Sequence, residues 1–196
     1  MMTVIDLEPS ARRLTDLLGT LADSQLWAPT PCEGYRVRDL LAHLLDVTSA
    51  FRDAATKVEG AAAAPSDATA AELDPHWRET LPRSIEAMVF AWRDPAAWEG
   101  TARAGGRLLP APIVGRIAAG ELLLHGWDLA RATEQPFSCD SRTAEASLHV
   151  MSLSANDSDQ RERQGLFGPP VEVSADASLL DRTIAMSGRN PQWAPI

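Results

Sequence analysis

The stretch Gly120–Thr133, "GELLLHGWDLARAT", decides how this chain folds and raises the first question about its chemistry. Apolar residues recur through it at helical spacing, and the pattern predicts a helix over Ile113–Ala132. Glu121, His125 and Asp128 interrupt the apolar residues of that helix. A buried carboxylate is costly unless a cation or several hydrogen-bond donors compensate it, so these polar residues need an explanation.

Other long segments repeat the helical spacing, whereas alternating strand patterns are scarce. Helices are expected over Leu7–Ala22, Val37–Lys57, Asp74–Arg93 and Ser141–Leu153, and a short last one over Leu179–Met186. Asp140 or Ser141 can accept hydrogen bonds from the free N–H groups at the start of the fifth helix. The four long helices before it predict an all-α fold, an antiparallel four-helix bundle with additional short C-terminal helices.

Segments rich in Pro, Gly or Ala separate these helices. The Ala-rich stretch "EGAAAAPSDATAAELDP" (59–75) is a low-complexity connector that lengthens the crossover between the second and third helices. The stretch "TARAGGRLLPAP" (101–112) forms either a short hairpin or an extended loop, and "RERQGLFGPPVEVSADAS" (161–178) is expected to be a loop with one extended piece. Since no internal repeat or domain boundary is visible, residues 1–196 are expected to form a single helical domain.

Composition and charge narrow the class of protein. The 196 residues are 45% apolar and 23% charged, which is typical of a globular domain with a real core. The net charge of −9 argues against nucleic acid and anionic membrane as partners, because both require a basic surface. The start of the chain lacks the pattern of a signal peptide, and no apolar run approaches the ~20 residues of a membrane span.

The two cysteines point to a reducing compartment. Cys32 and Cys139 lie far apart and neither belongs to a CxxC pair, so no disulfide framework is expected. The sequence therefore predicts a cytoplasmic protein. Cys32 could be a fourth metal ligand or a reactive thiol, although a small packed side chain is the favoured interpretation for a cysteine in this Pro-flanked loop.

Three residues form a candidate site. Glu121 and His125 lie four residues apart and therefore on one helix face, one turn from each other. Such a pair commonly forms a simple hydrogen bond at a helix surface. His43 is the ionisable residue at the inner edge of the apolar stripe of the helix Val37–Lys57, where a core histidine bonded to a carbonyl or carboxylate is the simpler interpretation.

A bound ion would explain all three residues if the two helices pack face to face. Two imidazole nitrogens and one carboxylate are a familiar ligand set for a catalytic divalent metal, and zinc with three protein ligands keeps its fourth position open. Such sites are built inside helix bundles. The spacing leaves the metal site and the simpler interpretations both open. Asp128 could hydrogen-bond a ligand imidazole from behind, or pair with Arg131 three residues further on.

The residues around this site also resemble a known family. The stretches "TPCEGYRVRDLLAHLLD" (30–46) and "ELLLHGWDLARATEQPF" (121–137) resemble the DinB-like metal-binding proteins, in the branch that contains the mycothiol-dependent maleylpyruvate isomerases. "GLFGPPVEV" (165–173) and "LLDRTIAMSGRNPQW" (179–193) are similar to the C-terminal signature of a short subgroup. Full-length isomerases carry a further C-terminal domain with a catalytic arginine, whereas only a short tail to Ile196 is expected here after the bundle.

The resemblance implies a four-helix bundle that binds a divalent metal, usually zinc, although nickel or another divalent ion is also compatible with it. The positions that match the family's ligands are His43, Glu121 and His125. In relatives the open metal position is thought to receive a low-molecular-weight thiol such as mycothiol. A metal-bound thiol is deprotonated, and the thiolate is the reactive nucleophile.

Several functions remain open at this point. The first is a metal-dependent thiol transferase or isomerase that acts on a small-molecule substrate. The second is a hydrolase that uses metal-bound water, whose pKa such a metal lowers to ~7. The third is a metal- or small-ligand-binding bundle without turnover, which could form a homodimer, and the fourth is a purely structural bundle without a metal. Whether the chain is an enzyme, and which residues would be catalytic, is not decided by the sequence.

Overall fold

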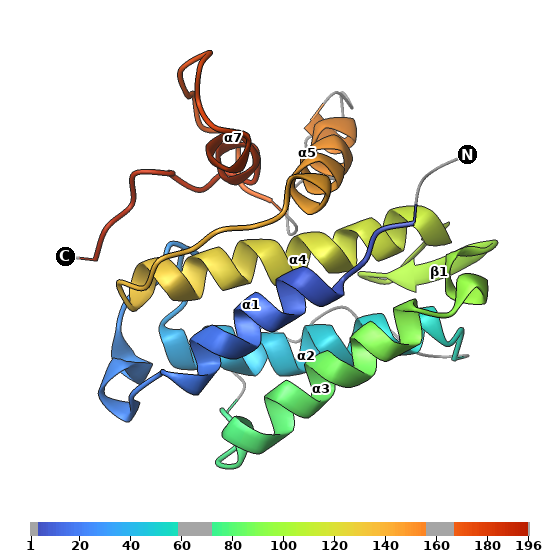
Figure 1. The fold of residues 1–196 in the computed structure, drawn as a ribbon, viewed down its shortest axis with the longest axis horizontal. Coiled ribbons are helices and arrows are strands. Elements are labelled where there is room, and N and C mark those ends of the chain that lie inside the picture. Colours follow the sequence, from blue (N-terminus) through green and yellow to red (C-terminus); the bar gives the residue numbers. More distant parts are fainter. Residues whose placement is uncertain (1–3, 59–71, 156–166, 196) are drawn as a thin grey trace.

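The computed structural model describes residues 4–58, 72–155 and 167–195 (Figure 1). Its α-helices are α1 (Glu8–Gly19), α2 (Val37–Ala55), α3 (Trp77–Trp92), α4 (Ala111–Ala132), α5 (Ser141–Ala155) and α7 (Leu179–Met186). Two 3-10 helices, η1 (Asp23–Trp27) and η2 (Pro95–Trp98), and two short strands, β1 (Thr101–Ala104) and β2 (Arg107–Pro110), complete the described elements. The predicted all-α class is therefore correct. None of the described helices is long and apolar enough to cross a membrane.

Helices α1 to α4 form the expected four-helix bundle. Helix α4 lies against α1 and α2, and α3 closes the bundle by contacting the same two helices. On its other side α4 carries α5, which in turn contacts α7 (Figure 1). Because α4 lies between two layers, it is buried on nearly all its faces, which explains why its sequence is apolar almost all round.

Two hydrophobic clusters fill these two layers. The larger cluster occupies the bundle, and the stripes expected on α1 and α2 point into it, with Leu14, Leu40, Leu41 and Leu44 fully buried. A second cluster lies between α4, α5 and α7 and comprises Leu123, Leu124, Trp127, Ala144, Met151 and Ile184. The region after the bundle is thus more than the short tail expected from the sequence, since α5 and α7 form a second cluster with the outer face of α4.

The observed helix ends follow local chemistry. Helix α5 begins at Ser141 as expected, and the carboxylate of Asp140 caps it by accepting a hydrogen bond of 2.9 Å from the N–H of Thr143. Helix α2 ends at Ala55, two residues before the expected end, and Lys57 then takes a positive φ of 55°. Helix α3 begins three residues later than expected, since Asp74 forms the preceding turn.

The first expected helix is also too long at its C-terminus. Helix α1 ends at Gly19, and the chain continues through Thr20 into η1 instead of reaching Ala22. The expected Ala-rich connector falls largely on residues 59–71, which lie outside the described residues. The expected extended piece within 161–178 is a loop over the described residues 167–178, with no strand there.

The Gly-rich segment before α4 is a hairpin. Strands β1 and β2 pair antiparallel, with Ala102 opposite Leu109. Gly105 and Gly106 form its tip with positive φ angles of 55° and 76°, which glycine adopts without steric cost. The hairpin leads directly into α4, which begins at Ala111. The N–H of Ala111 donates to the carbonyl of Gly100 at 3.0 Å and so ties the start of the helix to the start of the hairpin.

Candidate metal centre

The packing of α2 against α4 brings His43, Glu121 and His125 together. One ligand atom from each of the three side chains lies within 4.8 Å of the other two. Oε2 of Glu121 is 3.1 Å from Nε2 of His125 and 3.8 Å from Nε2 of His43. The two imidazole rings meet edge to face, with their centroids 4.8 Å apart. The three residues singled out in the sequence therefore share one site.

Burial rules out the simplest alternative for Glu121 and His125. Their side chains are 16% and 6% exposed, so the pair is not a hydrogen bond on a solvated helix face. The His43 side chain is 14% exposed, and its Nδ1 atom has no hydrogen-bond partner among the described residues. A histidine with one orphaned nitrogen and the other facing a carboxylate is not the fully satisfied core histidine of the simpler interpretation.

Glu121 and His125 each stabilise the charged form of the other and so shift each other's pKa. Burial raises the pKa of Glu121, but hydrogen bonds and positive charge from His125 and His43 outweigh burial and hold that pKa below its usual value of 4.5. Burial lowers the pKa of His125, but Asp128 and Glu121 outweigh it and hold the pKa above the usual 6.5. In the absence of a metal, the buried carboxylate is therefore compensated chiefly by the proton that His125 retains.

The set of donor atoms suits a divalent metal. Two imidazole nitrogens and one carboxylate oxygen converge from two rigid helices, which is the ligand set of many catalytic zinc sites. Each of these groups binds a metal in its deprotonated form, so an ion would take the place of the proton that balances Glu121. His43, Glu121 and His125 are thus one of two groups of described residues that could hold such an ion, and the other group is Cys32, His125 and Asp128.

Asp128 lies directly behind His125. Its carboxylate is fully buried, and Oδ2 lies 3.0 Å from Nδ1 of His125. Arg189 donates to the same carboxylate through two nitrogens, Nε to Oδ1 at 2.7 Å and Nη2 to Oδ2 at 2.8 Å. Arg131 instead donates to the backbone carbonyl of Trp193, at 2.9 Å from Nε. Of the two partners considered for Asp128, the structure therefore shows the imidazole and not Arg131.

Arg189 is the main residue that sequence reasoning missed. It lies 61 residues after Asp128, just beyond α7, and no periodicity connects the two. The available signal was indirect: a carboxylate within an apolar helix needs a buried cation as well as an imidazole. Burial disfavours its charge, yet the neighbouring carboxylate of Asp128 keeps the pKa of Arg189 above its ordinary value, so the guanidinium stays charged.

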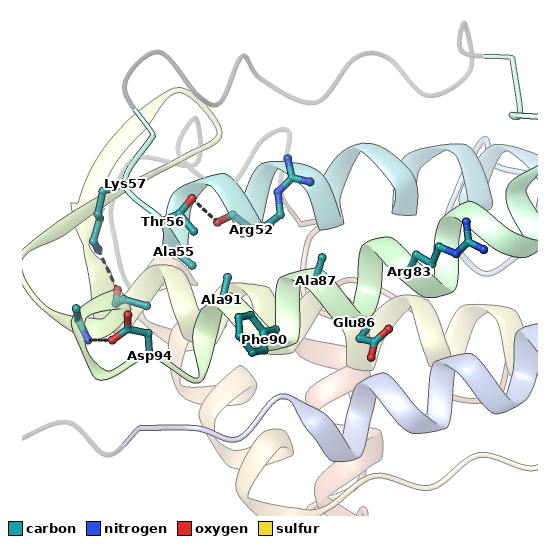
Figure 2. A pocket seen from close by; sticks show the side chains of 12 residues that line it. Arg52, Ala55, Thr56, Lys57, Arg83, Glu86, Ala87, Phe90, Ala91 and Asp94 are labelled. Atoms are coloured by element: carbon teal, nitrogen blue, oxygen red, sulfur yellow. Dashed lines mark hydrogen bonds between the residues drawn. The ribbon is translucent and has the colours of Figure 1, made fainter.

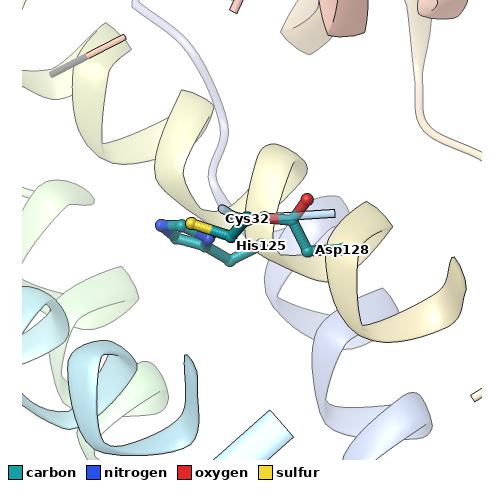
Figure 3. A group of neighbouring side chains, drawn as sticks. All are labelled: Cys32, His125 and Asp128. Carbon is teal, nitrogen blue, oxygen red and sulfur yellow. Dashed lines mark hydrogen bonds and ion pairs between the residues drawn. The ribbon is translucent and has the colours of Figure 1, made fainter. Parts of the chain in front are cut away.

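Cys32 belongs to the surroundings of His125, but not to the group formed by His43, Glu121 and His125. Its sulfur lies within 4.8 Å of a ligand atom of His125 and of Asp128, and Figure 3 shows these three side chains together. Burial, with a smaller contribution from Asp128, raises the pKa of the Cys32 thiol to about 12. A protonated, partly buried thiol is a weak nucleophile, as the favoured interpretation of a packed side chain implies.

The loop before α2 places an aromatic ring beside His43. The hydroxyl of Thr30 donates to the carbonyls of Cys32 and Tyr35, at 3.1 and 2.9 Å, and fixes the loop. Gly34 turns the chain with a φ of 81°. The Tyr35 ring then meets the His43 ring edge to face, with a centroid distance of 5.7 Å. The loop thus closes the α2 side of the candidate metal centre.

A separate groove lies between the C-terminal half of α2 and helix α3 (Figure 2). It has a volume of about 740 Å³, and none of the three candidate ligands lines it. Its rim carries both signs of charge, from Arg52, Lys57 and Arg83 on one hand and from Glu86 and Asp94 on the other. Neither of the two groups of described side chains that could hold a metal ion includes a residue of this groove.

Comparison with known proteins adds a family. The model of the mycothiol maleylpyruvate isomerase N-terminal domain matches residues 7–130. A crystal structure of the mycothiol-dependent maleylpyruvate isomerase superposes with a TM-score of 0.62 at 17% identity, covering 95% of this chain and 88% of that chain. A histidine-to-alanine mutant of such an isomerase gives a TM-score of 0.56 at 16% identity, with 81% and 70% covered. No curated protein matches the chain.

The two kinds of match carry different conclusions. At these low identities the solved structures show a common fold, which extends beyond residue 130 because nearly all of this chain is covered. The family model matches more than half of the chain, and the matched range contains His43, Glu121 and His125. The chain therefore belongs to the family of the mycothiol maleylpyruvate isomerase N-terminal domain.

Proposed function

We propose that this protein is a metal-dependent enzyme that uses a low-molecular-weight thiol to isomerise or transfer a small electrophilic substrate. The observation that carries the proposal is the convergence of one ligand atom each from His43, Glu121 and His125 where α2 packs against α4. Zinc is the proposed ion, because imidazole and carboxylate ligands suit it and no redox chemistry is needed, and nickel or another divalent ion is the alternative. The proposed location is the cytoplasm.

The residues of the chain have distinct tasks in this proposal. When bound, a divalent metal supplies the Lewis acidity that holds a small thiol as its nucleophilic thiolate. Glu121 contributes the negative charge of the site and stays ionised, since its pKa lies below the usual value. Asp128 accepts the Nδ1 proton of His125 and so keeps Nε2 available for the ion. Three protein ligands leave a coordination position for the thiol.

Family membership supports the choice of a thiol. The solved isomerase structures are named for their dependence on mycothiol, and the family model for this chain carries the same name. We assign to this chain only the class of reaction, because the electrophile depends on residues outside the three ligands. Cys32 is not proposed as the nucleophile, since burial keeps its thiol protonated.

The first test is metal retention in protein purified without an affinity tag. We expect elemental analysis to find a stoichiometric divalent metal in the wild type, and replacement of a ligand by His43→Ala, Glu121→Gln or His125→Ala to abolish it. His149→Ala, which removes an exposed histidine on α5, is the matched control and should keep the metal. Full occupancy in all three ligand variants would show that the metal is held elsewhere.

The second test is turnover of a panel of small electrophiles by metal-loaded protein, with and without an added low-molecular-weight thiol. Thiol-dependent turnover that is lost in His43→Ala is the expected result. Turnover that needs no thiol would replace the proposal with a hydrolase that uses metal-bound water. Metal binding without any turnover would replace it with a binding protein.

A further inference from the structure

A row of buried polar groups runs from the C-terminal segment to the candidate metal centre. Arg189 donates to both oxygens of Asp128, and Oδ2 of Asp128 also faces Nδ1 of His125 at 3.0 Å. The Nε2 atom of His125 in turn lies 3.1 Å from Glu121. The segment after α7 thus contacts the centre through only one intervening side chain.

We propose that Arg189 is a positioning residue that acts on His125 through Asp128, and that it links the docking of the C-terminal segment to metal binding. The inference deepens the proposed function and rests on its metal centre. Arg189 fixes the orientation of the Asp128 carboxylate, and the carboxylate holds the Nδ1–H of His125, so that Nε2 is the nitrogen that faces Glu121 and His43 and would bind an ion. Placing a carboxylate behind a ligand histidine in this way typically governs metal affinity.

The geometry of the ion pair between Arg189 and Asp128 explains why an arginine is needed at position 189. Asp128 is fully buried, and an unpaired carboxylate in such a place would be strongly unfavourable. A guanidinium that binds both carboxylate oxygens fixes the plane of the group, which a lysine ammonium would not do. Oδ2 is thereby held in the position from which it accepts the Nδ1 proton of His125.

The backbone places Arg189 before any ligand arrives. The N–H of Gly188 donates to the carbonyl of Ala185 at 3.0 Å, and the N–H of Arg189 to that of Ile184 at 3.3 Å. These two bonds, with a φ of 90° at Gly188, are those of a Schellman motif that ends α7. A Cβ at Gly188 would lie 2.6 Å from Cα of Gly168, so only glycine allows this close backbone contact.

The contacts of Arg189 also indicate that it positions His125 and does not itself take part in catalysis. Nε and Nη2 are bonded to Asp128, and Nη1 lies 3.2 Å from the hydroxyl of Ser187. Every nitrogen of the guanidinium thus has a partner within the protein, and the side chain is only 11% exposed. Arg189 is therefore assigned to the support of His125 and not to contact with substrate.

Arg131, at the end of α4, provides a matched control because it contacts the same C-terminal segment. Its Nε donates to the backbone carbonyl of Trp193 at 2.9 Å, four residues after Arg189. Arg131→Gln therefore removes an anchor of the C-terminal segment without touching Asp128. A variant that only loosens the segment can thus be compared with one that also changes the support of His125.

The test measures metal-free and metal-bound protein separately. Side-chain nitrogen NMR of His125 reports the Nδ1–H hydrogen bond to Asp128 without metal, competition with a chromophoric chelator reports zinc affinity, and hydrogen exchange reports the docking of residues 179–195. We expect Arg189→Gln to weaken that hydrogen bond and to bind zinc about 10- to 100-fold more weakly, the range typical of such support residues. Arg189→Lys should restore part of the affinity.

The proposed link between metal binding and the docking of residues 179–195 gives a second expected result. Zinc should slow hydrogen exchange in residues 179–195 of the wild type, because a ligand that binds the docked state stabilises it, and this effect should disappear in Arg189→Gln. Arg131→Gln should exchange faster in the segment yet keep the Nδ1–H hydrogen bond of His125 and the zinc affinity of the wild type. If Arg189→Gln does not fold, the double variant Asp128→Leu with Arg189→Met removes both charges together and should show the same loss of zinc affinity.

Two results would overturn the inference. One is an Arg189→Gln protein with the Nδ1–H hydrogen bond and the zinc affinity of the wild type, and the other is an Arg131→Gln protein that loses as much affinity as Arg189→Gln. A wild type that binds no divalent metal would instead contradict the proposed function. The Nδ1–H hydrogen bond of His125 in metal-free protein would still decide whether Arg189 and Asp128 position the ring.

Discussion

His125 is the residue on which the chemistry of this site depends, because both of its ring nitrogens face a carboxylate. Glu121 lies at Nε2 and Asp128 at Nδ1. An imidazole between two carboxylates holds a proton more tightly than usual when no metal is present. The same proton must leave when a metal binds, so pH should act in opposite directions on the metal-free and the metal-bound protein.

The metal-free protein should lose stability as the pH rises. Asp128 and Glu121 outweigh burial and hold the pKa of His125 above 6.5, so its stabilisation is present below pH 6.5 and is lost as pH rises through the raised pKa. For Glu121 the pKa lies below 4.5, so its stabilisation is present above pH 4.5 and is lost as pH falls through the lowered value. With a chelator present, the two groups together make the protein most stable at pH values between the lowered pKa of Glu121 and the raised pKa of His125.

Denaturant unfolding of the wild type and His125→Gln over a pH series would measure this effect. With a chelator, the difference in free energy of unfolding between the two proteins should shrink as the pH rises above 6.5. With saturating zinc the difference should grow over the same range, because zinc binds the deprotonated imidazole. The same slope with and without zinc would contradict the assignment of His125 as a ligand.

Sequence reasoning found the residues of the site that share a helix or interrupt an apolar stripe. Glu121 and His125 were visible because they are four residues apart, and His43 because it lies among leucines. Arg189 and Tyr35 were not, because their contacts with Asp128 and His43 arise from tertiary packing and loop geometry. Local spacing encodes neighbours on one element, and it carries no information about residues brought in from elsewhere.

At the scale of the element, α4 is distinguished by how closely other parts of the chain approach it. Gly115 lies under a pair of indole rings that meet edge to face, with Trp98 and Trp92 centroids 5.0 Å apart. Both rings are fixed by hydrogen bonds to backbone carbonyls, Trp98 Nε1 to Trp92 at 2.7 Å and Trp92 Nε1 to Phe51 at 3.0 Å. The indoles cannot easily move to admit a larger residue.

Two glycines of α4 should therefore respond in opposite ways to the same substitution. A Cβ at Gly115 would lie 2.5 Å from the Trp98 ring, so Gly115→Ala should cost about 1–3 kcal/mol of stability through overpacking. A Cβ at Gly120 would lie 3.4 Å from the hydroxyl of Ser147, which is nearly ordinary contact. Gly120→Ala should be neutral or gain up to about 1 kcal/mol, because alanine favours the helix.

Urea unfolding of the two variants beside the wild type would test this prediction. Because both substitutions add the same methyl group to the same helix, the change in helix propensity cancels in the comparison. The difference between them then reports the space around each Cα. Equal stability of the two variants would mean that the tryptophans do not pack on α4 as described.

The sequence predicted which helices exist better than where each of them ends. Helix α7 has the expected bounds, because Ser178 caps its first turn through a 3.0 Å hydrogen bond from the N–H of Asp181. Helix α3 starts late because the Asp74 carboxylate accepts from the N–H of His76 at 2.8 Å and so closes a turn. A residue with this chemistry can begin a helix or precede one, and apolar periodicity does not distinguish the two.

At the scale of the whole molecule, α4 joins two hydrophobic clusters that periodicity could not assign. Leu122 and Leu129 belong to the bundle cluster, whereas Leu123 and Trp127 belong to the cluster with α5 and α7. A helix that is apolar on every side signals burial, but it does not say which elements cover each face. The four-helix bundle and the existence of α5 and α7 were therefore predictable, whereas the packing of these two helices as a second layer on α4 was not.

The shared helix predicts how the whole molecule unfolds. Undocking α5 and α7 would expose the outer face of α4 and would leave the carboxylate of Asp128, fully buried, without Arg189. Unfolding the bundle would remove the surface on which the second cluster packs. We therefore expect neither cluster to be stable without the other, and the whole molecule to unfold in one cooperative transition.

Truncations in each cluster would test this cooperativity. Leu41→Ala in the bundle and Ile184→Ala in the second cluster both remove fully buried side chains, and each should cost about 2–5 kcal/mol. In calorimetry, both variants should shift a single transition to lower temperature, with the calorimetric enthalpy still equal to the van't Hoff enthalpy. Two resolved transitions in Ile184→Ala, with the second one at the wild-type temperature, would instead show that the C-terminal layer unfolds on its own and that α4 does not couple the clusters.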